Sequence, residues 1–91
     1  MPHFVYILEC SDHTFYTGST SNLKKRLHAH NHLKSGAHYT KIRRPVLLRY
    51  SETVDSLAFA RKREAEWKRL TREEKIDLIA THQNNTANMV V

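Results

Sequence analysis

The chain has 91 residues, the length of one small domain. Its 40% apolar and 26% charged residues, with two Gly and two Pro, are typical of a globular protein and exclude collagen-like and low-complexity classes. The single cysteine, Cys10, excludes an internal disulfide, and no apolar run approaches the ~18 residues of a membrane span, so we expect a reducing, cytoplasmic setting without a membrane partner.

The net charge of +6 comes from one part of the chain. Residues 13–51 carry eight Lys and Arg and no acid, whereas the remainder sums to 7 − 9 = −2. This asymmetry predicts a surface that faces a polyanion such as nucleic acid. The alternative is a solvated face that keeps the protein soluble.

Two strands are expected first. Residues 4–8 form a continuous apolar run, which predicts a strand that is covered on both faces. A short polar break at residues 11–13 and β-favouring residues at 14–17 predict a hairpin that ends at Gly18.

A helix over residues 22–33 and a third strand follow. Ser19 to Asn22 supply candidate N-caps, and Leu23, Leu27 and His30 recur on one side of the helix. Gly36 is a plausible C′ residue. Residues 37–45 read as a basic loop, and residues 46–50 as a third strand.

Two helices complete the domain. Asp55 or Ser56 can cap a helix from residue 57 to about 70, and Thr71 opens another with Glu74 in a capping box. The pattern predicts an α/β (α+β) fold: a small three-stranded antiparallel sheet of order 2-1-3, flanked by three helices. We expect one domain over residues 1–83 and a flexible tail over 84–91.

Several polar residues fall on faces that this fold buries. Tyr6 and Tyr16 lie on neighbouring strands, where a tyrosine by itself usually serves packing. Arg26 and His30 are four residues apart beside the Leu23/Leu27 stripe. A packed arginine stem and a satisfied core histidine are the structural alternatives.

Glu64 is the most informative of these residues. It follows Ala60 by four positions, and Leu57 and Ala60 mark the expected inward face of their helix. A carboxylate there is costly unless it is paired or binds a metal ion. The alternative is an i, i+4 ion pair with Lys68, which is worth a few tenths of a kcal/mol.

Two other possible sites are unconvincing. His28, His30 and His32 cannot converge on one metal ion, because alternate residues of a helix point ~200° apart. Cys10 has no base beside it in sequence and reads as a small apolar strand residue.

Together these residues resemble the GIY-YIG nuclease family. The two half-motifs read Phe4-Val5-Tyr6 and Tyr16-Thr17-Gly18, and Arg26, His30 and Glu64 follow at the family's positions. The resemblance covers residues 3–80 and is closest to the small stand-alone bacterial group called YhbQ/YazA-like. Phe4 and Thr17 depart from the family's glycine and isoleucine, which serve the backbone and packing.

The resemblance implies a metal-dependent endonuclease. Glu64 would bind one divalent ion, Mg²⁺ or Mn²⁺, and Arg26 would hold the scissile phosphate. Tyr6 and Tyr16 would orient the attacking water and help to deprotonate it, and His30 would bond the water or the phosphate. These five side chains should surround one shallow groove. The residues expected to bind nucleic acid outside that set are Ser19, Lys24, Lys25, Lys41, Arg43 and Arg44.

The expected substrate is DNA rather than RNA, structured or single-stranded and linked to repair or recombination. A protein partner would select the target, because no residues remain for a second DNA-binding domain; we expect a monomer or weak dimer. One alternative is a nucleic-acid-binding module that cleaves poorly. Another is an RNA-binding protein that stacks bases on Tyr39 and Trp67.

Overall fold

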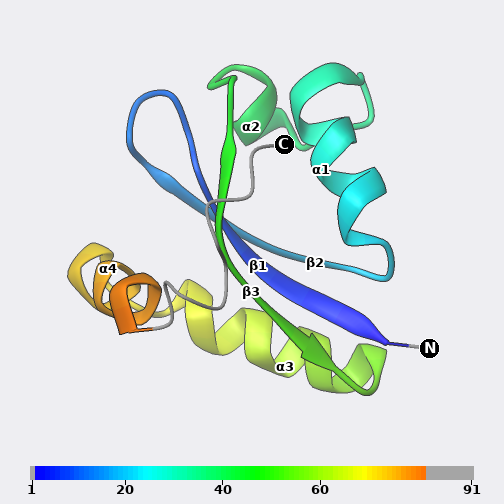
Figure 1. The fold of residues 1–91 in the computed structure, drawn as a ribbon, viewed down its shortest axis with the longest axis vertical. Helices are drawn as coiled ribbons and strands as arrows, with labels where there is room; N and C mark the ends of the chain where they lie inside the picture. The colour runs from blue at the N-terminus through cyan, green and yellow to red at the C-terminus, as the bar shows by residue number, and fades with distance from the viewer. Residues whose placement is uncertain (1, 82–91) are drawn as a thin grey trace.

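The computed structural model describes residues 2–81 and has the expected sheet order, β2-β1-β3, with all strand pairs antiparallel. Figure 1 shows helices on both sides of this sheet. The elements, in chain order, are β1 (His3–Glu9), β2 (Phe15–Thr20), α1 (Leu23–His32), α2 (His38–Lys41), β3 (Leu47–Val54), α3 (Leu57–Lys68) and α4 (Arg72–Thr81).

Strand β1 is central because both of its faces are apolar. Val5, Tyr6, Ile7 and Leu8 are all at most 1% exposed. Their side chains alternate between two cores, as the strand pleat requires. Strand β3 pairs with it from His3 to Glu9 and β2 from Phe4 to Glu9, and a bulge at Ile7/Leu8 shifts the β3 register.

The two cores lie on opposite faces of the sheet. Val5 and Ile7 pack with Ala60 and Trp67 of α3 and with Ile79 of α4. The other face packs Tyr6 and Leu8 against Leu27 of α1, together with Cys10, Val46 and Leu48. Side chains of a functional site can therefore come from two layers, one on each face of the sheet.

The predicted caps are present. The Asn22 side chain accepts from the Lys25 N–H at the start of α1, and the Ser56 side chain accepts from the Phe59 N–H at the start of α3. Thr71 and Glu74 exchange backbone-to-side-chain hydrogen bonds of 2.9 and 3.2 Å, which is a capping box.

Three local predictions need correction. Within residues 37–45, expected as a loop, the chain forms the short helix α2, so four helices flank the sheet. Strand β3 continues to Val54, because it pairs with β1 as far as His3. Gly36 lacks a positive φ; it is needed because a Cβ there would lie 2.5 Å from the Ala29 carbonyl oxygen.

The expected tail at 84–91 and the expected domain end at residue 83 lie outside the described residues. Among residues 2–81, no helix is long and apolar enough to cross a membrane.

Candidate active site

The first part of the site is a buried hydrogen bond between Tyr6 and His30. The Tyr6 hydroxyl oxygen lies 2.7 Å from His30 Nε2, and both residues are at most 1% exposed. On its other side the imidazole Nδ1 lies 2.8 Å from the Thr40 hydroxyl oxygen. Both ring nitrogens are therefore engaged inside the protein, so a direct contact of His30 with phosphate or water, as expected from the sequence, is wrong for this conformation.

Gly18 makes room for Tyr6. The two residues are direct partners in the β1–β2 ladder, and a Cβ at position 18 would lie 2.5 Å from the Tyr6 hydroxyl oxygen. Only glycine allows the phenol to lie across β2 toward the outer edge of the sheet. This is why the second half-motif needs its glycine, although Gly18 does not have a positive φ.

Burial sets the protonation states of this pair. Burial lowers the pKa of His30 to about 4, and the charges of Arg26 and Arg44 act in the same direction. Burial also raises the pKa of Tyr6 well above its ordinary value, against a hydrogen bond from Arg26. At neutral pH both groups are therefore uncharged.

Tyr16 is half-buried and completes an aromatic group around His30. Its ring centroid lies 5.3 Å from that of His30 in an edge arrangement and 6.0 Å from that of Tyr39 in a stacked one. The Arg43 guanidinium lies 3.8 Å above Tyr39. Tyr16 is the more accessible of the two motif tyrosines.

Arg26 reaches this group from α1. Its Nη1 donates to the Ser35 carbonyl at 3.0 Å, and it acts to lower the pKa of Tyr6. It also lines a surface depression of about 450 Å³ together with Asn22, Lys25 and Ser35. The guanidinium is thus half-buried, held by the Ser35 carbonyl and open to a ligand in the depression.

Glu64 is held by two partners. Its Oε1 accepts from the Ser19 hydroxyl at 2.6 Å, and its Oε2 pairs with Lys68 Nζ at 2.7 Å. Burial favours the neutral acid, but the hydrogen bonds from Lys68 and Ser19 outweigh it and keep the pKa of Glu64 below its ordinary value. The i, i+4 pair with Lys68 that the sequence offered as an alternative is therefore present. Glu64 is an anion at neutral pH.

Glu64 does not share a face with the tyrosines. Ser19 pairs with Val5, on the face that α3 covers, whereas Tyr6 belongs to the core under α1. The two groups are connected through β2, the outer strand, which carries Tyr16 toward one face and Ser19, the partner of Glu64, toward the other. The structure thus gathers Tyr6, Tyr16, Arg26 and His30 on one face, and the expectation that Glu64 joins them around one groove is wrong, because α3 covers the opposite face.

The inward face expected for α3 is only partly correct. Ala60 is buried and the Glu64 side chain is 21% exposed, but Leu57 is 45% exposed. Trp67 is 3% exposed and packs against Tyr50, so it cannot stack an RNA base, and that alternative loses one of its two aromatics.

A hard divalent cation fits the Glu64 position. Magnesium usually keeps several waters and binds proteins through one or two carboxylates plus substrate phosphates. Among residues 2–81, no three His, Cys, Asp or Glu side chains gather as a metal cage, so Glu64 would be a single protein ligand. An ionised, half-buried carboxylate beside an exposed lysine that can swing away meets that requirement.

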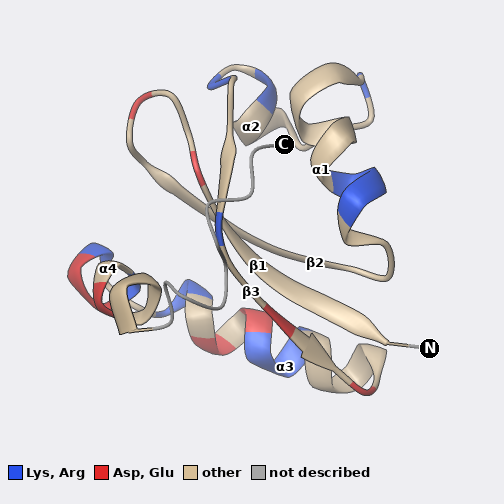
Figure 2. Ribbon diagram, in the orientation of Figure 1, with Lys and Arg blue, Asp and Glu red and all other residues tan. Residues whose placement is uncertain are grey.

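Some basic residues are exposed on the surface, and others donate hydrogen bonds within the protein. Figure 2 shows Lys and Arg on the first turns of α1, without an acid in that helix. Lys24 and Lys25 are exposed there. By contrast, Arg44 donates to the Ala29, His30 and Leu33 carbonyls at 2.7–3.2 Å and caps the end of α1.

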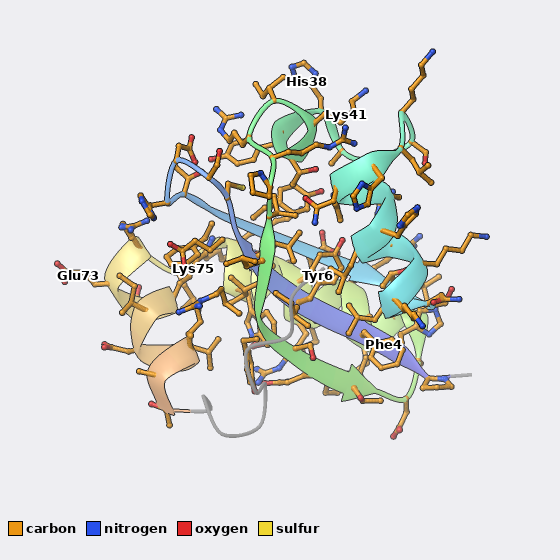
Figure 3. All side chains as sticks on the ribbon, turned by 45° about the horizontal axis from the view of Figure 1, so that its top comes forward. Phe4, Tyr6, His38, Lys41, Glu73 and Lys75 are labelled. Atoms are coloured by element: carbon orange, nitrogen blue, oxygen red, sulfur yellow. The ribbon has the colours of Figure 1, made fainter. Side chains whose placement is uncertain are left out.

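The remaining predicted nucleic-acid contacts also have protein partners. Arg43 pairs with Asp12 at 3.0 Å, and Lys41 Nζ donates to the Lys34 carbonyl at 3.2 Å. In Figure 3, Lys41 and His38 lie at the periphery on α2, away from Tyr6 in the middle of the molecule. The Ser19 hydroxyl is bound to Glu64. Their roles toward nucleic acid stay predictions.

Sequence reasoning missed Thr40 as a member of the site. It is fully buried and bonds His30, yet it falls in a stretch that looks like a basic loop. The missed signal is the spacing. The backbone N–H groups of Thr40 and Lys41 both donate to the Ala37 carbonyl and form one helical turn, which directs the Thr40 side chain inward.

Comparison with known proteins identifies the chain's relatives. The family model described as "GIY-YIG catalytic domain" matches residues 2–77. A UPF0213 protein of Syntrophus aciditrophicus is 58% identical over 77 residues, covering 85% of this chain and 88% of the relative. A UPF0213 protein of Streptococcus agalactiae is 48% identical over 84 residues, covering 92% of this chain and 94% of the relative.

Two solved structures share the fold. The solution structure of the UPF0213 protein of Bacillus halodurans is 38% identical, with a TM-score of 0.58, and covers 89% of this chain and 85% of that one. A protein from E. faecalis, also solved in solution, is 36% identical with a TM-score of 0.63, covering 91% and 88%.

Proposed function

Because the chain belongs to the GIY-YIG catalytic domain family, whose nuclease members generally use a divalent metal ion, we propose that it is an endonuclease that hydrolyses phosphodiester bonds in DNA. The observation that carries the proposal is the placement of a half-buried guanidinium at Arg26 of α1 and an ionised carboxylate at Glu64 of α3, which is bonded to Ser19 of strand β2. The Arg26 guanidinium is suited to bind a phosphate and the Glu64 carboxylate is suited to bind a cation, and a hydrolytic site needs both.

The substrate would lie along the outer edge of β2. A strand of DNA placed there reaches Arg26 in its depression on one face and Glu64 on the other. The exposed Lys24 and Lys25 extend the positive surface from the same depression. Such contacts track the backbone and do not read bases, which suits a structured or single-stranded substrate.

The chemistry is divided among the chain's own side chains. Arg26 binds the scissile phosphate and stabilises the negative charge that grows on it. Tyr16, the more accessible tyrosine, orients the attacking water. Tyr6 is buried and neutral, and donates to His30. Glu64 holds the cation, Mg²⁺ or Mn²⁺, which when bound supplies charge stabilisation at the leaving 3′ oxygen.

A binding module with little cleavage of its own is the second candidate. It is favoured by one observation: both Glu64 oxygens already have protein partners, so the carboxylate is satisfied without a cation. Such a protein would bind nucleic acid through α1 and rely on a partner for catalysis.

A cleavage screen separates the two candidates. The purified chain is incubated with duplex, flap, branched and single-stranded DNA, and with matching RNA, with Mg²⁺, Mn²⁺ or EDTA. The endonuclease proposal predicts metal-dependent cuts in at least one DNA substrate. Salt-sensitive binding without cleavage of any substrate supports the binding module instead.

A further inference from the structure

A chain of three hydrogen bonds connects Tyr6 to the start of α2. It runs from Tyr6 to His30 Nε2 at 2.7 Å, from His30 Nδ1 to Thr40 at 2.8 Å, and from the Thr40 hydroxyl to the Ala37 carbonyl oxygen at 2.9 Å. The three side chains of this chain are buried, Tyr6 at 1% and His30 and Thr40 at 0% exposed. At its Tyr6 end the Arg26 guanidinium acts to lower the pKa of the phenol.

The last group sets the direction of the chain. The Ala37 carbonyl oxygen can only accept, so Thr40 donates its one hydroxyl proton to it. The Thr40 oxygen then accepts from His30, and because a neutral imidazole has one N–H, His30 must carry it on Nδ1. His30 Nε2 is left bare and accepts the buried Tyr6 proton.

The reverse direction would fail at Tyr6. If Thr40 donated to Nδ1, the imidazole would carry its proton on Nε2 and donate to Tyr6. The buried Tyr6 proton would then have no acceptor among residues 2–81, because His30 Nε2 is the hydrogen-bond partner of the hydroxyl there. A buried, unsatisfied hydroxyl proton costs about 1–3 kcal/mol.

We infer that Thr40 is a positioning residue: by accepting from Nδ1 it holds His30 in the Nδ1–H tautomer, so that Tyr6 donates its proton to His30 and keeps its lone pairs for the Arg26 guanidinium that binds the phosphate. The inference rests on the proposed function for the role of Arg26, but the tautomer of His30 stands independently of it. Thr40 touches no reacting atom; it acts through His30 and Tyr6.

The first test needs no variant and no substrate. A long-range ¹H–¹⁵N correlation spectrum of the ¹⁵N-labelled protein at neutral pH reports which imidazole nitrogen carries the proton. We expect His30 to be protonated at Nδ1 and bare at Nε2, whereas free imidazole side chains prefer the Nε2–H form. A wild-type spectrum with His30 as the Nε2–H tautomer would overturn the inference.

Thr40→Val and Thr40→Ser then connect the tautomer to activity. Valine keeps the shape but cannot accept, so the Nε2–H form should appear and kcat should fall at least tenfold; serine should restore both. The control is Thr17→Val, another buried threonine, whose hydroxyl has no hydrogen-bond partner among residues 2–81. It should change neither readout. A Thr40→Val protein with the wild-type tautomer and rate would refute Thr40 as the positioning residue.

The two proposals can fail separately. If the wild-type protein cleaves nothing but His30 is the Nδ1–H tautomer and Thr40→Val shifts it, the positioning role stands and the nuclease proposal falls. If cleavage occurs and the tautomer is Nε2–H, the nuclease proposal stands and the role of Thr40 falls.

Discussion

Gly18 lies directly opposite Tyr6 in the β1–β2 ladder, and a Cβ on Gly18 would lie 2.5 Å from the Tyr6 hydroxyl oxygen and 2.7 Å from its Cζ. The tyrosine cannot yield easily, because its rigid ring is buried and its oxygen is bonded to His30. The glycine of the second half-motif therefore leaves the space that the tyrosine of the first half-motif occupies.

Gly18→Ala should displace the Tyr6 hydroxyl. We expect a loss of about 1–3 kcal/mol in the free energy of unfolding, as for other overpacked sites, and at least a tenfold loss of cleavage. Urea denaturation and a cleavage assay measure the two effects. In the double variant with Tyr6→Phe, part of the stability loss should disappear because the closest contact is gone. Additive losses would contradict the contact.

Thr17→Val should stabilise the protein. Thr17 is 3% exposed, and within the part of the chain that the structure describes its hydroxyl oxygen has no hydrogen-bond partner, although it lies on the face under α3. Valine removes the unsatisfied group at nearly constant volume, so the free energy of unfolding should rise by about 1 kcal/mol. Thermal denaturation checks this at constant pH. A lower Tm would mean that the hydroxyl has a partner.

As pH falls, the first decrease in the free energy of unfolding should come from His30. Its pKa is about 4 when folded against an ordinary 6.5, so between these values the unfolded chain binds more protons than the folded one. The stabilising contribution is complete above pH 6.5 and is lost as pH falls to 4, by up to about 3 kcal/mol. Glu64, with a lowered pKa, loses its contribution only below its ordinary value of 4.5.

The pH dependence can be assigned with two glutamine variants. Denaturation of His28→Gln, which removes an exposed histidine, should keep the wild-type slope between pH 6.5 and 4. His30→Gln, although less stable overall, should show a much flatter slope in this window. An unchanged slope in His30→Gln would show that another group titrates there.

Arg44 and Lys25 should separate folding from nucleic-acid binding. Arg44→Ala removes the donors to three carbonyls at the end of α1 and should cost about 1–3 kcal/mol of stability. Lys25 is exposed beside the Arg26 depression, so Lys25→Ala should leave stability within about 0.5 kcal/mol. It should reduce the slope of log K against log salt by about 0.7–0.9. Equal salt slopes for Lys25→Ala and wild type would remove Lys25 from the interface.

The sequence could predict the strands, the caps and the two half-motifs, because each depends on local patterns. The apolar run at β1, the Asn22 and Ser56 caps and the Thr71–Glu74 box are examples. The joint recognition of Tyr6, Tyr16, Arg26, His30 and Glu64 came from the family resemblance.

The remaining features depend on contacts between distant segments. Thr40 joins the site only because α2 packs beside α1, and Arg44 is a cap because residues 33–44 fold back on α1. Which face of the sheet Glu64 approaches depends on the path of the chain between β3 and α3. A list of residue spacings does not contain these relationships.

In the proposed endonuclease Glu64 serves catalysis by holding a cation, and the Glu64→Gln variant tests this role. The change keeps size but removes the charge that a hard cation requires. The control is Glu66→Gln on the same helix, which loses only a surface ion pair with Arg63. Because Lys68 is 57% exposed, losing its pair with Glu64 should change stability by no more than about 1 kcal/mol.

The measurement is the rate of DNA cleavage in Mg²⁺ for both glutamine variants, together with their DNA affinity. We predict that Glu64→Gln loses cleavage by at least a hundredfold while its affinity for DNA is unchanged or higher, because a negative charge near the phosphates is gone. Glu66→Gln should cleave like the wild type. A folded Glu64→Gln protein that cleaves at the wild-type rate would contradict the role of Glu64 as the cation ligand.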